Sequence, residues 1–240
     1  MKHIIYTILA LVLLTACQQD ELSVAEQGKA VLELTLTRAG RPVATTRAID
    51  DDLAIDIYKA GNIPYVHYDA GSVPEKINLE PGTFRVVAYT DNQETWKTAN
   101  NGRGEACYYA EASVEMESDM VVRLALDVPM TNYAVGLQLP EHFNDLFRAY
   151  TFILKSGGRT TSIKEGERAY FDVADASFTY SLRATNTDGT THSHSAIEFP
   201  EIEAGKLFTI CYSYDSDANS GGVDIVITDD METDDSDVNL

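Results

Sequence analysis

Apolar and polar residues alternate along most of the chain, with the period of two that is typical of β-strands with one buried face. Residues 30–37 show this clearly, because Leu32, Leu34 and Leu36 are separated by charged and hydroxyl-bearing residues. The same signal predicts further strands in the first half at residues 53–58, 65–68, 75–79, 83–89, 106–114 and 120–127. A polar loop at residues 91–105 and an exposed loop ending in the three aspartates at 50–52 interrupt this run.

The second half continues the pattern after Pro129. It predicts strands at residues 133–139, 150–155, 160–163, 168–171, 177–185, 190–199, 207–214 and 223–228, with one short helix at 141–148. Residues 81–89 align with residues 176–184, and the strand pairs that follow also fall in step. We therefore predict an all-β fold of two tandem β-sandwich domains, at residues 28–128 and 129–228.

An apolar run at residues 4–14 precedes the first predicted strand, and it has the length of a secretory signal rather than of a membrane span. It ends in Leu-Thr-Ala-Cys, which resembles the bacterial lipobox. The resemblance implies that residues 1–16 are removed and that Cys17 carries a covalent lipid, followed by a spacer at 17–27. The Gln-Gln-Asp-Glu that follows resembles the export signal of Bacteroidetes lipoproteins, which implies an outer-membrane anchor facing the exterior.

Acidic residues outnumber basic ones, and the formal net charge is −20. Nucleic acid and anionic lipid carry the same sign, so the charge argues against both as partners. Six acids lie in the last segment, residues 229–240, which we expect to be a disordered acidic tail. Cys107 and Cys211 are too few for a disulfide scaffold, and their apolar flanks favour buried thiols over a bridge.

Motifs for catalysis are missing from the sequence, which has no Gly-x-Ser-x-Gly, no His-Glu-x-x-His and no phosphate-binding glycine loop. We therefore predict neither an enzyme nor a cofactor beyond the lipid. His192 and His194 would share one face of a strand, but two ligands do not make a metal site. The calcium-like run that begins at Asp215 lacks the required glycine and the bidentate glutamate, so we expect no metal there.

Trp96 is the single tryptophan of the chain. An aromatic ring in a polar loop has two readings, since it can stack on a sugar or pack against the sandwich. We therefore keep Trp96 as a candidate carbohydrate contact, with packing as the alternative.

The first strand has a further property, because an exposed Thr46-Arg47-Ala48 follows it. A protease that cuts between Arg47 and Ala48 would free this strand and leave pockets for Leu32, Leu34 and Leu36. A groove of this kind binds a strand from another molecule.

The lipobox, the early Thr-Arg-Ala segment and the doubled sandwich together resemble the fimbrillin superfamily of Bacteroidetes. Residues 53–58, 77–84 and 169–171 are similar to a family of fimbrillin-like lipoproteins that is catalogued as a domain of unknown function. The resemblance implies transthyretin-like (Greek-key) sandwiches, cleavage at Arg47 and assembly into pili by strand exchange. The expected partners are the outer membrane, other fimbrial subunits and host surface ligands.

We therefore predict a surface lipoprotein with a structural or adhesive role. The alternative is a glycan-binding lipoprotein that works beside an outer-membrane nutrient importer, and it rests on the Trp96 loop and the surface address. The heavily acidic tail after residues 223–228, the predicted donor strand, departs from polymerising pilins, so shaft, tip and anchor roles stay open.

Overall fold

The computed structural model describes residues 28–38, 49–215 and 220–229, and strands make up most of their regular structure. The elements are β1 (Ala30–Arg38), β2 (Ala54–Lys59), β3 (Ile63–Tyr68), β4 (Lys76–Leu79), β5 (Gly82–Tyr89), α1 (Ala99–Gly102), β6 (Tyr109–Met116), β7 (Val121–Val128), β8 (Tyr133–Gln138), α2 (Phe143–Leu146), β9 (Phe147–Ser156), β10 (Arg159–Ile163), β11 (Arg168–Phe171), a 3₁₀ turn η1 (Val173–Asp175), β12 (Phe178–Asn186), β13 (Thr191–Phe199), β14 (Lys206–Asp215) and β15 (Ser220–Asp229).

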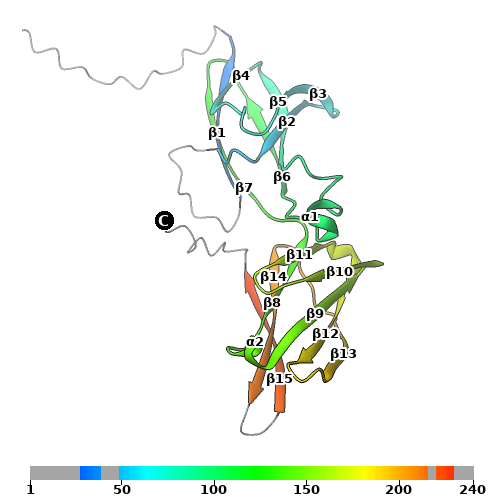
Figure 1. Cartoon of the computed structure of the whole chain (residues 1–240). Coiled ribbons are helices and arrows are strands. Elements are labelled where there is room, and N and C mark those ends of the chain that lie inside the picture. The colour runs from blue at the N-terminus through cyan, green and yellow to red at the C-terminus, as the bar shows by residue number, and fades with distance from the viewer. Residues whose placement is uncertain (1–27, 39–48, 216–219, 230–240) are drawn as a thin grey trace, which may run out of the picture.

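The strands form four sheets, two from each half of the chain (Figure 1). In the first half the strand orders are β4-β1-β7 and β3-β2-β5-β6, and in the second half they are β11-β8-β14-β15 and β10-β9-β12-β13. In each half the first strand lies parallel to a strand from near the end of that half. β1 pairs with β7, and β8 pairs with β14. Apart from β15, each strand of the second half therefore has a counterpart in the first half.

One cluster of buried apolar side chains lies between the two sheets of each half. Met130 is the last buried member of the first cluster and Tyr133 is the first of the second. The ring of Tyr133 contacts Phe171, Phe178 and Phe208, while its hydroxyl forms a 2.9 Å hydrogen bond with the hydroxyl of a buried serine. Burial of apolar area on this scale is the main stabilising term in a sandwich.

The all-β sandwich fold predicted from the alternation is confirmed. The aligned segments 81–89 and 176–184 correspond to β5 and β12, which hold equivalent places in their sheets. The helix expected at residues 141–148 is limited to α2, because β9 already begins at Phe147. The division into domains at residues 128 and 129 stays a prediction. No helix in the described part of the chain is long and apolar enough to span a membrane.

Candidate functional site

The first strand occupies the centre of the three-stranded sheet. β1 pairs antiparallel with β4 over four residues and parallel with β7 over eight. Val31 donates its N–H to the carbonyl of Met120 at 2.8 Å, and Leu34 donates to the carbonyl of Glu75 at 2.8 Å. Both edges of β1 are therefore hydrogen-bonded, and its removal would leave β4 and β7 without their common neighbour.

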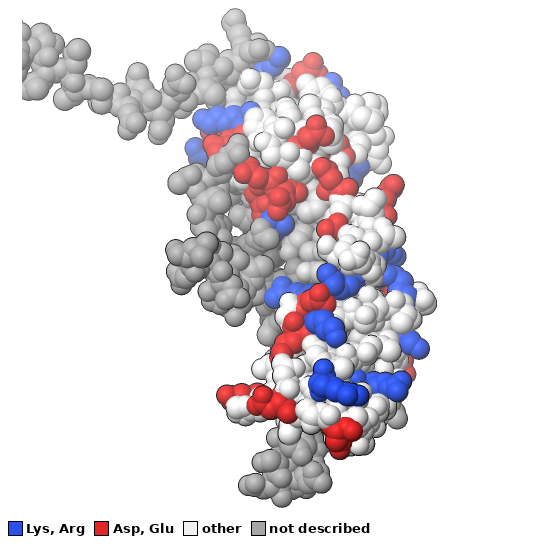
Figure 2. Space-filling model, viewed as in Figure 1, with Lys and Arg blue, Asp and Glu red and all other residues white. Residues whose placement is uncertain are grey.

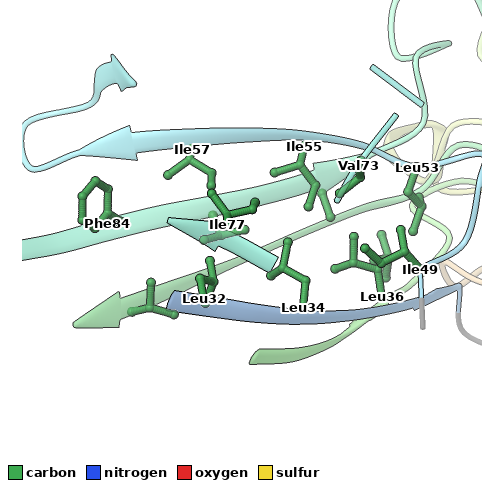
Figure 3. Close-up of a cluster of buried hydrophobic side chains, with 14 of the residues drawn as sticks. Leu32, Leu34, Leu36, Ile49, Leu53, Ile55, Ile57, Val73, Ile77 and Phe84 are labelled. Carbon is green, nitrogen blue, oxygen red and sulfur yellow. The ribbon is translucent and has the colours of Figure 1, made fainter. Parts of the chain in front are cut away.

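The inner face of β1 lies in the first core cluster. Leu32, Leu34 and Leu36 are 0%, 2% and 1% exposed, and in Figure 3 they point toward Ile55 and Ile57 of β2. Full burial of three leucines contributes on the order of 5–9 kcal/mol. That is comparable with the whole free energy of unfolding of a small domain, about 5–15 kcal/mol. The half of the protein that contains β1 therefore depends on having a strand in this position.

Arg38 fixes the end of β1. Its side chain is 7% exposed, its Nε lies 2.7 Å from Asp50 Oδ2, and its Nη2 lies 2.6 Å from Asp52 Oδ2. The guanidinium also lies over the ring of Tyr108, 5.3 Å from its centroid. Burial opposes the charged form of Arg38, but the hydrogen bond and charge of Asp50, with the charge of Asp52, raise its pKa above the usual value.

The prediction of an exposed loop that ends at residues 50–52 is wrong at Ile49 and Asp50. Ile49 is buried, bridges to Leu36 and belongs to the first core cluster, and Asp50 is 17% exposed. The pairing with Arg38 explains the difference, because a carboxylate of an acidic run can be drawn against the fold by a buried cation.

The predicted lipid attachment residue Cys17 and the predicted processing bond between Arg47 and Ala48 lie outside the described residues. They stay predictions. The structure describes the strand they would act upon and the chain from Ile49 onward, and it brings Leu32, Leu34 and Leu36 together on one buried face.

Trp96 lies where the first half meets the second. It is 6% exposed, and the guanidinium of Arg159 lies 5.6 Å from its ring centroid. Arg159 also donates hydrogen bonds at 2.8 Å to the carbonyls of Gly102 and Tyr170, so one side chain links both halves. The carbohydrate contact stays a prediction, but a ring with this little accessible surface offers no platform for a sugar.

The loop that carries Trp96 meets β11 closely. Tyr170 donates its N–H to the carbonyl of Arg103 at 2.7 Å, and Lys97 pairs with Asp172 at 2.7 Å. Gly104 has φ of +81°, and a side chain added there would begin 3.1 Å from the carbonyl oxygen of Tyr170. Glycine is therefore required at this close approach.

Cys107 and Cys211 form no disulfide among the described residues, and Cys107 is buried while Cys211 is half-buried. Burial raises the pKa of the Cys107 thiol, which lowers its reactivity. No group of three or more metal-ligating residues occurs in the described residues. His192 contacts the Asn186 amide and the ring of Phe147.

A polar cluster on the outer face of the β3-β2-β5-β6 sheet was not foreseen from the sequence. The carboxylate of Asp56 accepts hydrogen bonds from the hydroxyls of Tyr58, at 3.2 Å, and Tyr89, at 3.0 Å. It also lies 2.9 Å from Nδ1 of His67, whose Nε2 lies 3.0 Å from Asp69. Burial and the hydrogen bond to Asp56 raise the pKa of Tyr89 to about 12. Alternation places Asp56 on the outer face, but its partners come from three strands whose pairing the alternation does not give.

We expect the contribution of His67 to stability to decrease as the pH rises. The carboxylates of Asp69 and Asp56 raise the pKa of His67, so the stabilisation is complete below its unfolded value of about 6.5 and is lost above its folded value. His67→Gln should lower the free energy of unfolding by up to about 1 kcal/mol at about pH 5.5, because the ion pair is half-exposed. At about pH 9 the same substitution should lower it by a smaller amount. Urea denaturation at both pH values measures this. Asp69→Asn should shrink the pH dependence, and an equal effect of His67→Gln at both pH values would contradict the assignment.

These features define the class of the protein: an all-β sandwich protein whose first strand is the central, buried strand of its sheet. The chain belongs to the family described as Domain of unknown function (DUF4493), whose model matches residues 26–240. Residues 1–18 match the model of the prokaryotic membrane lipoprotein lipid attachment site, so the chain is a lipid-anchored membrane protein. The lipobox that contains Cys17 lies within that match.

No curated protein matches the chain. Among solved structures, a candidate cell adhesion protein from Bacteroides uniformis is 15% identical, with a TM-score of 0.48 and coverage of 85% of this chain and 99% of that one. The tip fimbrial protein Mfa3 from Porphyromonas gingivalis, with a C-terminal truncation, is 8% identical, with a TM-score of 0.46 and coverage of 84% and 99%. The fimbrial anchor protein Mfa2 from the same organism is 10% identical, with a TM-score of 0.38 and coverage of 84% and 98%.

Proposed function

We propose that the protein is a non-enzymatic surface lipoprotein that acts as a subunit of a fimbria-like assembly, anchored in the outer membrane and facing the exterior. Cleavage between Arg47 and Ala48 frees β1, and a strand of another subunit takes its place. The observation that carries the proposal is the position of β1, which is hydrogen-bonded on both edges, buried on its inner face and first among the described strands. A host surface ligand fits the same adhesive role.

The chain order makes such an excision feasible. β1 continues into the rest of the fold through residues 39–48, and the strands from β2 to β7 follow without returning to residues before β1. One cut in that segment therefore separates β1 from every other strand. The same cut separates Cys17 from the fold, so an excised strand would leave with the lipid anchor.

A cut strand does not leave by itself, since its leucines and its hydrogen bonds to β4 and β7 still hold it. An incoming strand must supply apolar residues at alternate positions and pair with β4 and β7 as β1 does. We therefore expect exchange to proceed by displacement from one end. On the outer face of β1, Glu33 pairs with Lys76 at 3.4 Å and Arg123 at 2.8 Å, so a donor strand with an acid at that place is favoured.

Acidic and basic side chains are interspersed on the face shown in Figure 2, and no continuous basic area covers its visible described residues. This mixed distribution on the visible face supports a partner that is recognised by backbone pairing and apolar pockets rather than by a charged surface.

An arginine-specific protease tests the proposal on the full chain purified in detergent. We expect one cut at Arg47, followed by a ladder of oligomers in unheated gel electrophoresis. Arg38 should resist, since it is buried and doubly paired. Arg41→Lys should leave the ladder intact, whereas Arg47→Lys should abolish it.

Addition of a synthetic peptide with the sequence of residues 29–38 supplies the second arm of this experiment. The peptide should compete for the groove and shorten the ladder, while a peptide with aspartate in place of the three leucines should not. A cut chain that loses its first strand yet stays monomeric would contradict assembly by strand exchange.

A further inference from the structure

The outer edge of β7 has no strand beside it among the described residues, because β7 is the last strand in the order β4-β1-β7. The carbonyl of Met120 accepts a hydrogen bond from β1, and backbone groups of successive residues in a strand point to opposite edges. The even-numbered residues of β7 therefore bond to β1. The N–H and C=O groups of the odd-numbered residues 121–127 point to the free edge.

The second half of the chain shows what occupies the corresponding edge there. β14, the counterpart of β7, pairs antiparallel with β15 over Lys206–Asp215. With that neighbour in place, the inner residues Phe208 and Ile210 of β14 are 1% and 0% exposed. Leu124 and Leu126 hold the equivalent positions in β7 but are only partly buried. Among the described residues, the first half thus has the edge without a strand beside it that corresponds to β15.

We propose that this edge pairs with the same edge of a second copy of the chain, with β7 antiparallel to β7 about a twofold axis at Ala125. The two three-stranded sheets then form one continuous sheet of six strands. Self-pairing is supported by the sequence of β7, Val-Val-Arg-Leu-Ala-Leu-Asp-Val, which is complementary to its own reverse. In this register Arg123 lies opposite the partner's Asp127 on the outer face, and Leu124 lies opposite the partner's Leu126 on the inner face.

Other registers are less favourable. Odd-numbered residues must face odd-numbered residues, because only these present free backbone groups at the edge. A twofold axis at Arg123 would place two arginines opposite each other, and one at Asp127 would place two aspartates opposite each other. Axes at Leu124 or Leu126 would leave both charges opposite uncharged residues. The axis at Ala125 alone pairs both charges with opposite charges.

Edge pairing of two short strands buries less surface than a standard stable interface, so the dimer should be weak in dilute solution. Attachment of both copies to one membrane or micelle raises their effective concentration. Pairing of this kind does not require cleavage, and β1 stays in its place. This separates it from strand exchange, in which β1 is cut and leaves. The two processes therefore give different results in one variant, Arg47→Lys.

Cross-linking through position 125 tests the proposal with the full lipidated chain in detergent. Ala125→Cys should give a dimer with a short bis-maleimide, because the two introduced thiols face each other across the axis. The wild-type chain and Ser113→Cys, exposed on the other sheet, should give none. Cross-linking should persist in Ala125→Cys/Arg47→Lys even if strand exchange fails. Absence of a dimer with Ala125→Cys would overturn the inference.

A charge swap tests the register within the Ala125→Cys chain. Arg123→Asp or Asp127→Arg alone should reduce the cross-linked fraction about tenfold, since each places like charges opposite each other. The double swap should restore most of it. The double swap also separates pairing from folding. Arg123→Asp removes the contact with Glu33 inside each copy whether or not the second swap is present, so recovery of the cross-link in the double swap reports pairing between copies. A cross-link that is insensitive to the swaps would overturn the register.

Discussion

Replacing Arg38 by methionine is expected to lower the free energy of unfolding by about 3 kcal/mol, measured by urea denaturation at neutral pH. Methionine keeps most of the apolar volume of the side chain but removes the guanidinium that pairs with Asp50 and Asp52. The Asp50 carboxylate, 17% exposed, then loses its nearest cation in a partly dry position. Loss of the contact with the Tyr108 ring adds to the effect.

Lys59→Met is the matched control for Arg38→Met. Lys59 pairs with Glu80 at 2.8 Å, but the two side chains are 40% and 57% exposed. An ion pair in water contributes less than about 1 kcal/mol, so this variant should remain close to wild type. Equal losses in the two variants would show that Arg38 acts as an ordinary surface charge.

Arg38 also bears on the proposed exchange, because it lies on β1 while Asp50 lies beyond the predicted cut. After cleavage this ion pair would join two separate chains and hold the end of the excised strand. Arg38→Met should therefore speed displacement of β1 from the cut protein, measured as faster appearance of the oligomer ladder. Lys59→Met should leave that rate unchanged.

The sequence predicted β1 well because its inner face is encoded locally. Leu32, Leu34 and Leu36 alternate with polar residues, and no other regular structure buries such a set on one face. The parallel partner β7 begins about ninety residues further along the chain, and no local pattern states which strands become neighbours. The central place of β1, which carries the functional proposal, was therefore not predicted from the sequence, and the structure supplied it.

The burial of Arg38 could not be predicted from the alternation of apolar and polar residues. It follows the last alternating residue and precedes Ala39 and Gly40, so its surroundings in the sequence are those of a strand end in solvent. Its burial arises from carboxylates twelve and fourteen residues later, which the sequence placed in an exposed loop. Long-range ion pairs of this kind depend on the closed geometry of the fold and have no periodic signal.

The two alternatives at Trp96 stayed open in the sequence for a related reason. A tryptophan in a polar loop is compatible with a sugar platform, and nothing beside it in the chain indicates packing. The residue that covers it, Arg159, lies in the other half of the molecule and is held by the carbonyls of Gly102 and Tyr170. The interpretation thus depended on how the two halves meet, which the sequence does not give.

Replacing Trp96 by alanine is expected to lower the free energy of unfolding by about 3–5 kcal/mol, measured by urea denaturation. The reason is the loss of a large ring that is 6% exposed and borders Arg159 at the junction of the two halves. Lys97→Ala is the control, because Lys97 also approaches the ring but is 48% exposed, and it should cost less than about 1 kcal/mol. Trp96→Ala and Arg159→Ala should be non-additive, since each removes the other's partner.

The same variant decides between packing and sugar recognition at this position. Because Trp96 is the single tryptophan, its fluorescence reports its environment directly. A buried ring should emit at short wavelength, resist acrylamide quenching and show no change when glycans are added. If instead Trp96→Ala kept full stability and abolished binding on a glycan array, the glycan-binding alternative would be favoured and the packing role refuted. The burial of the ring and its contact with Arg159 predict the opposite result, in which Trp96→Ala causes a large loss of stability and the wild-type chain shows no glycan binding that depends on this ring.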